Sequence, residues 1–391
     1  MKNFTMFVPT RTIFGVGALN KLHEQVMPGK KALLVISNGK SIRDNGYLHR
    51  VEEELKIAKV EFTVFDKIEA NPFKDTIMYG AAFAKENACD FVVALGGGSV
   101  MDAAKIIAMM AKNPGDLWEY VYGGTGKGQR ATGGNLPIVC ITTTAGTGSE
   151  VDPWGVINNA STCEKVACGG LATLFPTFSI VDPELTITIP AKLTAYQGFD
   201  ALFHSIECYI SKAANSLSDI YALTAVNNIA NYLARACRAG NDIEAREHLA
   251  FASNLSGIVM NISTCTSEHA MEHAMSAYYH KLPHGAGLIM ISQAYYEHLI
   301  SKHACDTRFI KLAKAMGKEN AAEPEDFVVM LEKLKRDCDV ADLMMSSYGI
   351  ERYKLPEIVD NARKTMRSLF RFDPIAIKRE ESLAIYEKSY K

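Results

Sequence analysis

The sequence lacks the features that mark membrane, secreted and nucleic-acid-binding proteins. No apolar run approaches the ~18 residues that a bilayer-spanning helix needs, and the first residues carry no apolar core of a secretory signal. Neither sign of charge dominates, because 42 Lys and Arg stand against 44 Asp and Glu, for a net charge of −2. Such a balance creates no field that attracts nucleic acid or an anionic membrane. We therefore expect a cytoplasmic protein that binds neither.

The cysteines form neither a disulfide framework nor a cysteine zinc site. Their number is nine, and no two are separated by only two residues. The closest pair, Cys163 and Cys168, is expected in a loop. A free cysteine usually behaves as a small buried hydrophobic residue, so we assign none of them a function.

The first half of the chain alternates short β-branched runs with helical stretches. Several runs are apolar without alternation, as expected for strands that are covered on both faces of a parallel sheet. This order predicts an open α/β sheet with right-handed crossovers. The predicted strands are 31–37, 60–65, 91–95, 137–142 and 178–181, and the helices between them include 74–87 and 99–111.

After Pro183 the β-branched runs disappear and helical spacing takes over. We therefore predict an α/β dinucleotide-binding domain over residues 1–183 and an all-helical metal-binding and substrate domain over residues 184–391. The clearest predicted helices of the second domain are 192–211, 216–239, 243–260 and 324–339.

A glycine-rich turn follows the predicted strand 91–95. Residues 96–98 are three consecutive glycines, which let a backbone turn tightly and let a phosphate approach main-chain N–H groups. The helix that follows directs its unpaired N–H groups and positive dipole end at such an anion. Ser99 is expected to cap this helix. The pattern favours phosphate binding over an ordinary strand-to-helix turn.

Residues 142–150 form a second polar stretch, rich in threonine and glycine, at the end of the predicted strand 137–142. Open α/β sheets place ligands at the carboxyl ends of their strands. A capped helix start, with Thr147 or Ser149 as the cap, explains the same composition. The residues alone do not separate these two interpretations.

Histidines and acids at helical spacing appear in the second half. Asp200 and His204 are four residues apart and share one helix face, and so do His269 and His273. His284 follows in a Pro-His-Gly break, where a side chain can project from a helix end. His280 is a possible alternative ligand. One carboxylate with three imidazoles favours Fe(II) or Zn(II) over Mg(II) or Ca(II).

In combination these motifs resemble the iron-containing (group III) alcohol dehydrogenase family, most closely its bacterial butanol dehydrogenase and aldehyde reductase branch. The resemblance extends over essentially the whole chain, and the order of its motifs is highly specific. The matching segments are 9–17, 96–99 with Asp102, 142–150, 180–185, 198–207, 269–279 and 283–285.

The resemblance implies a homodimer or larger homo-oligomer with the active site in a cleft between the two domains. It implies metal ligands at Asp200, His204, His269 and His284, with His273 as an active-site histidine that is not a ligand. It also implies cofactor contacts from Gly96, Gly97, Gly98, Ser99, Thr142, Thr143, Thr147 and Lys165. Asp102 in the same motif, and Ser37 and Asn38 at the end of strand 31–37, complete the predicted cofactor site.

The predicted reaction moves a hydride between NAD(P)(H) and a primary alcohol or aldehyde. The ion would lower the barrier to hydride departure, and His273 or a water that it holds would relay the proton. After strand 31–37 no acid occurs before Asp44, whereas Lys40 and Arg43 are cations. An acid there would repel a 2′-phosphate, so its absence favours NADP(H) over NAD(H).

Four other functions fit part of the pattern. A polyol dehydrogenase of the glycerol type, or a lyase like dehydroquinate synthase, would share the scaffold, although no extra basic residues stand out to bind a substrate phosphate. A metal-binding or nucleotide-binding protein without turnover would keep the same ligands. A metallohydrolase would leave both glycine-rich strand ends unexplained.

Overall fold

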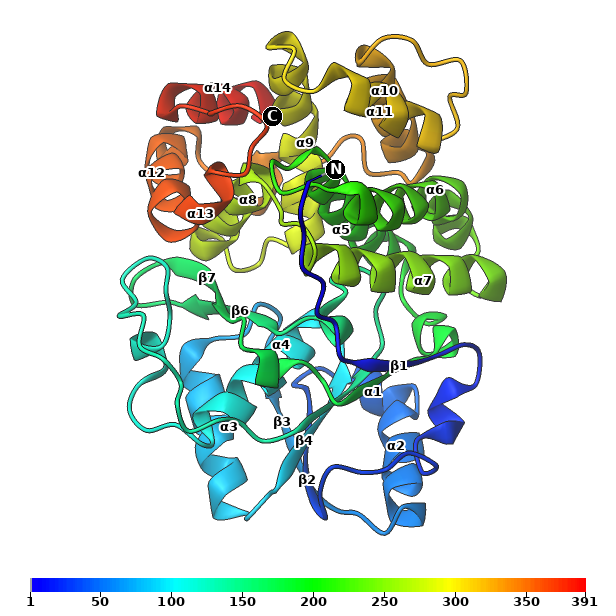
Figure 1. Ribbon diagram of the computed structural model, residues 1–391, viewed down its shortest axis with the longest axis vertical. Coiled ribbons are helices and arrows are strands. Elements are labelled where there is room, and N and C mark those ends of the chain that lie inside the picture. Colours follow the sequence, from blue (N-terminus) through cyan, green and yellow to red (C-terminus); the bar gives the residue numbers. More distant parts are fainter. Residues whose placement is uncertain (1) are drawn as a thin grey trace. The chain divides into compact units, whose positions relative to one another are not determined.

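The computed structural model describes residues 2–391, which divide into two compact units. The sheet unit consists of residues 8–144 and 148–188, and the helical unit consists of residues 2–7, 145–147 and 189–391 (Figure 1). The predicted fold class, a parallel α/β sheet followed by a helical region, is confirmed.

The sheet unit is built on six parallel strands in the order β1-β8-β5-β4-β2-β3. A separate antiparallel hairpin pairs β6 with β7. The bounds are β1 Arg11–Phe14, β2 Lys31–Ser37, β3 Glu61–Ile68, β4 Phe91–Gly96, β5 Ile138–Thr142, β6 Trp154–Asn159, β7 Glu164–Gly169 and β8 Phe178–Val181. The helices of this unit are α1 Ser41–Asp44, α2 Tyr47–Ile57, α3 Lys74–Glu86 and α4 Gly98–Met110.

Helices on both faces explain why the central strands are apolar without alternation. Every residue of β4 and β5 is buried. Val51 and Leu55 of α2 pack in one core with Leu34 of β2, and α3 and α4 cover the opposite face (Figure 1). Side chains on both faces of these central strands are therefore removed from water, which favours apolar residues such as Val, Ile and Leu along the whole strand.

The hairpin β6–β7 corrects the loop that was expected around Cys163 and Cys168. Cys168 is buried inside β7, and Cys163 lies in the turn with a left-handed φ of +50°. The pattern misled because the strands are short and carry Asn and Gly, residues that are uncommon in strands. All nine cysteines are free thiols, as expected.

The helical unit is dominated by α5, which is buried along most of its length. Its aromatic residues Phe199 and Phe203 form a core with Tyr296. Gly198 admits the neighbouring helix, because a Cβ there would lie 2.2 Å from Leu233 Cδ1. The helices are α5 Ala191–Ile210, α6 Ser216–Arg238, α7 Ile243–Met260, α8 Ser267–Tyr278, α9 His284–Ser301, α10 Asp306–Ala315, α11 Glu325–Asp337, α12 Leu355–Thr365, α13 Arg367–Phe370 and α14 Arg379–Ser389.

Within residues 2–391, none of the helices has both the length and the apolar character that crossing a bilayer requires.

Candidate metal and cofactor sites

Three helices of the helical unit bring the predicted ligands together. Asp200 and His204 lie one turn apart on α5, and both are buried. His269 lies in the first turn of α8. His284 is the first residue of α9, and Pro283 at the N-cap supplies the break that the sequence pattern indicates. Two side chains of α5 and one each from α8 and α9 therefore lie close together.

That common point lies beside Oδ1 of Asp200. This oxygen is 3.7 Å from Nδ1 of His204, 3.6 Å from Nε2 of His269 and 3.4 Å from Nε2 of His284. These distances exceed an ordinary hydrogen bond. Ligands bound ~2.1 Å from one tetrahedral ion lie roughly 3.4 Å from each other. The spacing therefore fits Asp200, His269 and His284 as donors to a single cation, whereas the ligand atoms of His204 group with those of His269 and Cys265.

The ligand atoms also lack protein partners. Oδ1 of Asp200, Nδ1 of His204 and Nε2 of His269 are buried and make no hydrogen bond to the protein. Leaving such a group unsatisfied costs on the order of 1–3 kcal/mol, so three of them at one point call for a ligand. The donor set of one carboxylate and three imidazoles matches Fe(II) or Zn(II).

Burial and the neighbouring groups together set the protonation of Asp200 and His204. Burial lowers the pKa of His204 to about 3, against the attraction of the Asp200 carboxylate, so the ring is neutral at physiological pH. Burial opposes ionisation of Asp200, yet interaction with the surrounding imidazoles of His204, His284 and His269 holds the pKa of Asp200 well below its usual range. A neutral imidazole and an ionised carboxylate are the forms that bind a metal.

His273 and His280 differ in their placement. His273 is buried on α8, and its ring centroid lies 5.3 Å from that of His284. Its ring nitrogen groups with His284 and Glu272 rather than with Asp200. His280 follows the end of α8 and is half-buried. Among the residues described, His280 belongs to none of the clusters of potential ligand atoms.

The sheet unit places the glycine turn at the end of β4. The helix α4 begins at Gly98, and its N-cap is Gly97. Ser99 is therefore inside the first turn, not at the cap, and its hydroxyl accepts a hydrogen bond from the N–H of Asn71. The cap expected at Ser99 was wrong because the glycines themselves close the turn, which leaves the first N–H groups of α4 without a side-chain cap.

The threonine-rich stretch lies beside this turn. Gly96 of β4 is aligned with Thr142 of β5, and the N–H of Thr143 donates to the carbonyl of Gly96. A Cβ on Gly97 would lie 2.8 Å from Cγ2 of Thr144. No long helix follows; the next element is the short 3-10 turn Ser149–Val151, and Gly148 is its N-cap. The alternative of a helix capped by Thr147 or Ser149 is therefore wrong.

Strand order places Ser37 and Asn38 at the same edge. β2 neighbours β4, and the chain reverses its direction of strand addition between these two strands. In open α/β sheets, ligands bind at the carboxyl ends of the strands that flank such a reversal. Ser37 ends β2 and Asn38 follows it, Gly96 ends β4, and Thr142 ends β5. We call this set of strand ends the sheet edge.

The other predicted cofactor residues lie in different surroundings. Both oxygens of Asp102 accept hydrogen bonds, at 2.5 Å from Ser149 Oγ and 2.9 Å from the N–H of Val156. Lys165 is buried in β7 and pairs across the hairpin with Asn158. Thr147 belongs to residues 145–147 of the helical unit.

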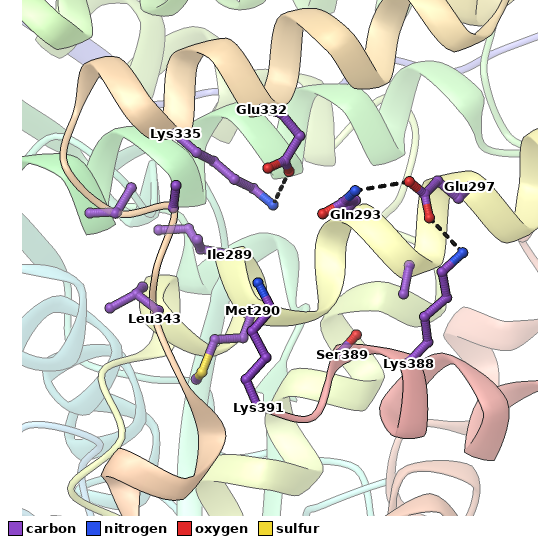
Figure 2. Close-up of a pocket in the computed structure, with 13 residues that line it drawn as sticks. Ile289, Met290, Gln293, Glu297, Glu332, Lys335, Leu343, Lys388, Ser389 and Lys391 are labelled. Atoms are coloured by element: carbon purple, nitrogen blue, oxygen red, sulfur yellow. Dashed lines mark hydrogen bonds and ion pairs between the residues drawn. The ribbon is translucent and has the colours of Figure 1, made fainter.

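A cavity elsewhere in the helical unit carries none of these residues. Figure 2 shows its charged lining, in which Lys335 pairs with Glu332 at 2.7 Å and Lys388 with Glu297 at 2.6 Å. Because these charges are balanced by their neighbours, we do not regard the cavity as a candidate active site.

Comparison with known proteins decides the family. The family described as iron-containing alcohol dehydrogenase matches residues 9–183, and the C-terminal domain of the Fe-containing alcohol dehydrogenase family matches residues 194–390. The chain belongs to the iron-containing alcohol dehydrogenase family. It is a metal-dependent oxidoreductase that transfers a hydride between a nicotinamide cofactor and a primary alcohol or aldehyde.

Relatives of this alcohol dehydrogenase match over much or all of its length. The 1,3-propanediol dehydrogenase of Klebsiella pneumoniae is 32% identical, in an alignment that covers 99% of each of the two chains. The NADH-dependent butanol dehydrogenase B of Clostridium acetobutylicum is 34% identical and covers 77% of this chain and 76% of its own. A solved archaeal halo-thermophilic alcohol dehydrogenase from a Red Sea brine pool has a TM-score of 0.94 at 33% identity, with 100% of both chains covered.

Two features of the alcohol dehydrogenase escaped the sequence reasoning. Lys105 is fully buried in α4 and pairs with Asp152 at 2.7 Å. Glu207 and Glu272 are buried beside His204, His269 and His284, which we call the histidine cluster. A signal for the glutamates was available, because Glu207 lies seven residues after Asp200 and Glu272 three after His269, spacings that share a helix face.

Proposed function

We propose that Asp200, His204, His269 and His284 hold the catalytic divalent ion of this alcohol dehydrogenase. The supporting observation is the approach of three imidazole nitrogens to Oδ1 of Asp200, at 3.4–3.7 Å. When bound, the ion supplies Lewis acidity toward the oxygen of the alcohol or aldehyde. Metal titration of the purified apoprotein tests the site: one ion per chain is expected, and none would contradict the proposal.

We propose that His273 handles the proton of the reaction. It is buried beside His284 without belonging to the group around Asp200. His273→Ala should lower kcat by about 10²–10⁴-fold, as expected for loss of a general acid–base group, while bound metal remains. His280→Ala is the matched control. Equal loss of metal and rate in His273→Ala would contradict a proton role and indicate a ligand.

We propose that the sheet edge binds the nicotinamide cofactor, with the phosphates at the N-terminus of α4. Main-chain N–H groups of the Gly97–Ser99 turn and the helix dipole supply the attraction for the pyrophosphate. Asp102, Thr147 and Lys165 complete this proposed site. The domain assignment follows from it, with residues 1–183 for the cofactor and residues 184–391 for the metal and substrate.

We propose a preference for NADP(H). No acid follows β2 before Asp44, and Lys40 remains as a cation, since Arg43 is paired with Asp66 at 2.9 Å. The Clostridium relative is named for NADH, which makes NAD(H) the competing outcome. Comparing kcat/KM for the two cofactors tests the proposal: a larger value with NADP(H) supports it, and a larger value with NAD(H) overturns it.

The ion is proposed to be Fe(II) or Zn(II), and the substrate a primary alcohol or aldehyde. Elemental analysis of anaerobically purified protein distinguishes the metals. A panel of alcohols, aldehydes and diols tests the substrate class. A 1,3-diol is the second candidate, because the Klebsiella relative of almost identical length is named for one.

We also propose a cytoplasmic homodimer or larger homo-oligomer. Light scattering of the purified protein and fractionation of expressing cells test these two statements separately.

A further inference from the structure

Two buried glutamates contact the imidazoles of the histidine cluster. Glu207 on α5 and Glu272 on α8 are both 0% exposed. A carboxylate oxygen of Glu207 is hydrogen-bonded to Nδ1 of His269, and one of Glu272 to Nδ1 of His284. Each glutamate thus binds a histidine on a different helix, Glu207 of α5 on α8 and Glu272 of α8 on α9.

We propose that Glu207 and Glu272 are positioning residues that orient His269 and His284 for the metal and strengthen both as ligands. This inference rests on the proposed metal site. It concerns Nδ1 of each imidazole, the ring nitrogen that is not proposed to bind the metal.

The geometry separates the two nitrogens of each ring. In both His269 and His284, Nδ1 faces the glutamate and Nε2 faces Oδ1 of Asp200, at 3.6 and 3.4 Å. An Nδ1–H that donates to a carboxylate fixes the neutral tautomer whose lone pair is on Nε2. The carboxylate also makes that lone pair more basic, which strengthens a metal bond.

Glu207 is held in place by the start of α8. Its Oε2 accepts from the N–H of Thr266 at 2.7 Å and from the Thr266 hydroxyl at 2.9 Å. Thr266 is the N-cap of α8, so the carboxylate lies at the positive end of the helix that carries His269. The hydroxyl of Tyr295 lies 2.9 Å from Thr266 Oγ1 and extends the network. Because several hydrogen bonds fix the Glu207 carboxylate, the carboxylate in turn fixes the orientation of the His269 ring.

Glu272 packs against α9 at a position where that helix has no side chain, Gly287. A Cβ on Gly287 would lie 2.7 Å from Cγ of Glu272 and 2.9 Å from its Oε1. Glycine at this position therefore lets the carboxylate reach His284, one turn earlier on the same helix. The third imidazole is held differently, because the backbone of Gly146 bonds to His204.

Metal affinity of single variants tests the proposal. Glu207→Gln and Glu272→Gln keep shape and a hydrogen-bond acceptor but lose the charge. We expect each to weaken Zn(II) binding about 10–100-fold, measured by competition with a chelator of known affinity. The charge-preserving Glu207→Asp and Glu272→Asp variants should recover part of this loss.

Glu268→Gln provides the matched control. Glu268 is equally buried, lies on α8 next to His269, and bonds to the hydroxyl of Tyr296 rather than to an imidazole. Its variant should bind Zn(II) like the wild type. If all three Gln variants bind Zn(II) as tightly as the wild type, the proposed role of the two glutamates is overturned, whereas the proposed metal site still stands. A wild-type protein that binds no ion would instead contradict the proposed function itself.

A measurement on the unmodified protein covers the case in which the variants do not fold. In Zn(II)-loaded protein with ¹⁵N-labelled histidine, His269 and His284 should both show a protonated Nδ1 and a metal-bound Nε2. Coordination of either ring through Nδ1 would overturn the proposal.

Discussion

The sheet edge and the histidine cluster solve the problem of ligand binding in opposite ways. At the sheet edge the proposed donors are main-chain N–H groups, and what matters about Gly97 is the side chain that it lacks. In the histidine cluster the proposed metal ligands are side chains, and two of them, His269 and His284, are hydrogen-bonded to a buried glutamate. Backbone sites therefore depend on close approach, whereas side-chain sites depend on layers of packing.

Charge differs between the two regions as well. In the sheet unit, buried Lys105 meets Asp152, so the charge is neutralised within the protein. In the helical unit, Asp200, Glu207 and Glu272 gather around neutral or hydrogen-bonded imidazoles. A divalent cation would offset their negative charge, which a buried site cannot leave uncompensated at low cost.

The largest expected effect comes from removing a proposed metal ligand. His269→Ala should release the metal and lower kcat/KM by ~10³-fold, equivalent to about 4 kcal/mol, because it also leaves Glu207 without its imidazole. Elemental analysis and steady-state kinetics measure both effects. The exposed His303 offers a control, since His303→Ala should change neither. Retention of one ion per chain in His269→Ala would contradict its role as a ligand.

Crowding the sheet edge should weaken cofactor binding alone. In Gly97→Ala the new Cβ would meet Thr144 at 2.8 Å, an overpacking that costs about 1–3 kcal/mol. We expect the Kd for the cofactor to rise about tenfold, with metal affinity unchanged. Adding Thr144→Ser removes the contacted methyl group and should restore part of the affinity. A Kd unchanged in Gly97→Ala would show that the cofactor binds elsewhere.

The corresponding glycine substitution beside the histidine cluster should weaken metal binding and leave cofactor binding unchanged. Gly287→Ala places a Cβ against Glu272 and should weaken metal binding several-fold while the cofactor Kd stays the same. Chelator competition and cofactor fluorescence titration measure the two constants. If both constants change together in Gly97→Ala and in Gly287→Ala, the two regions are not independent.

The smallest expected effect is a pH dependence of stability in the sheet unit. Burial raises the pKa of Asp102 from 3.8 to about 6, so between these pH values the folded protein holds a proton that the unfolded chain releases. The contribution to stability is therefore present at pH 4 and lost as the pH rises to 6. Asp102→Asn gives up one hydrogen bond, but its stability deficit should shrink by on the order of 1 kcal/mol over this range. Urea unfolding at several pH values measures it, and a constant deficit would contradict the raised pKa.

Much of the sheet was predictable from composition. The strand prediction for β2 matches at both ends, as does that for β8, because both-sided burial leaves a continuous apolar run with sharp polar limits. The hairpin β6–β7 was missed, since its short strands carry no such run. The cap of α4 was also mispredicted. Its N-cap is Gly97 and not Ser99, because the glycine backbone closes the turn without a side-chain cap.

Sequence spacing by itself determined which side chains share a helix, because α-helical periodicity is local: Asp200 with His204, and His269 with His273. Only the tertiary structure decided that α5, α8 and α9 bring Asp200, His269 and His284 to one point, and that His280 stays outside it. It also decided which glutamate faces which imidazole. Convergence of separate helices depends on packing between residues far apart in the chain, and local pattern carries no information on that packing.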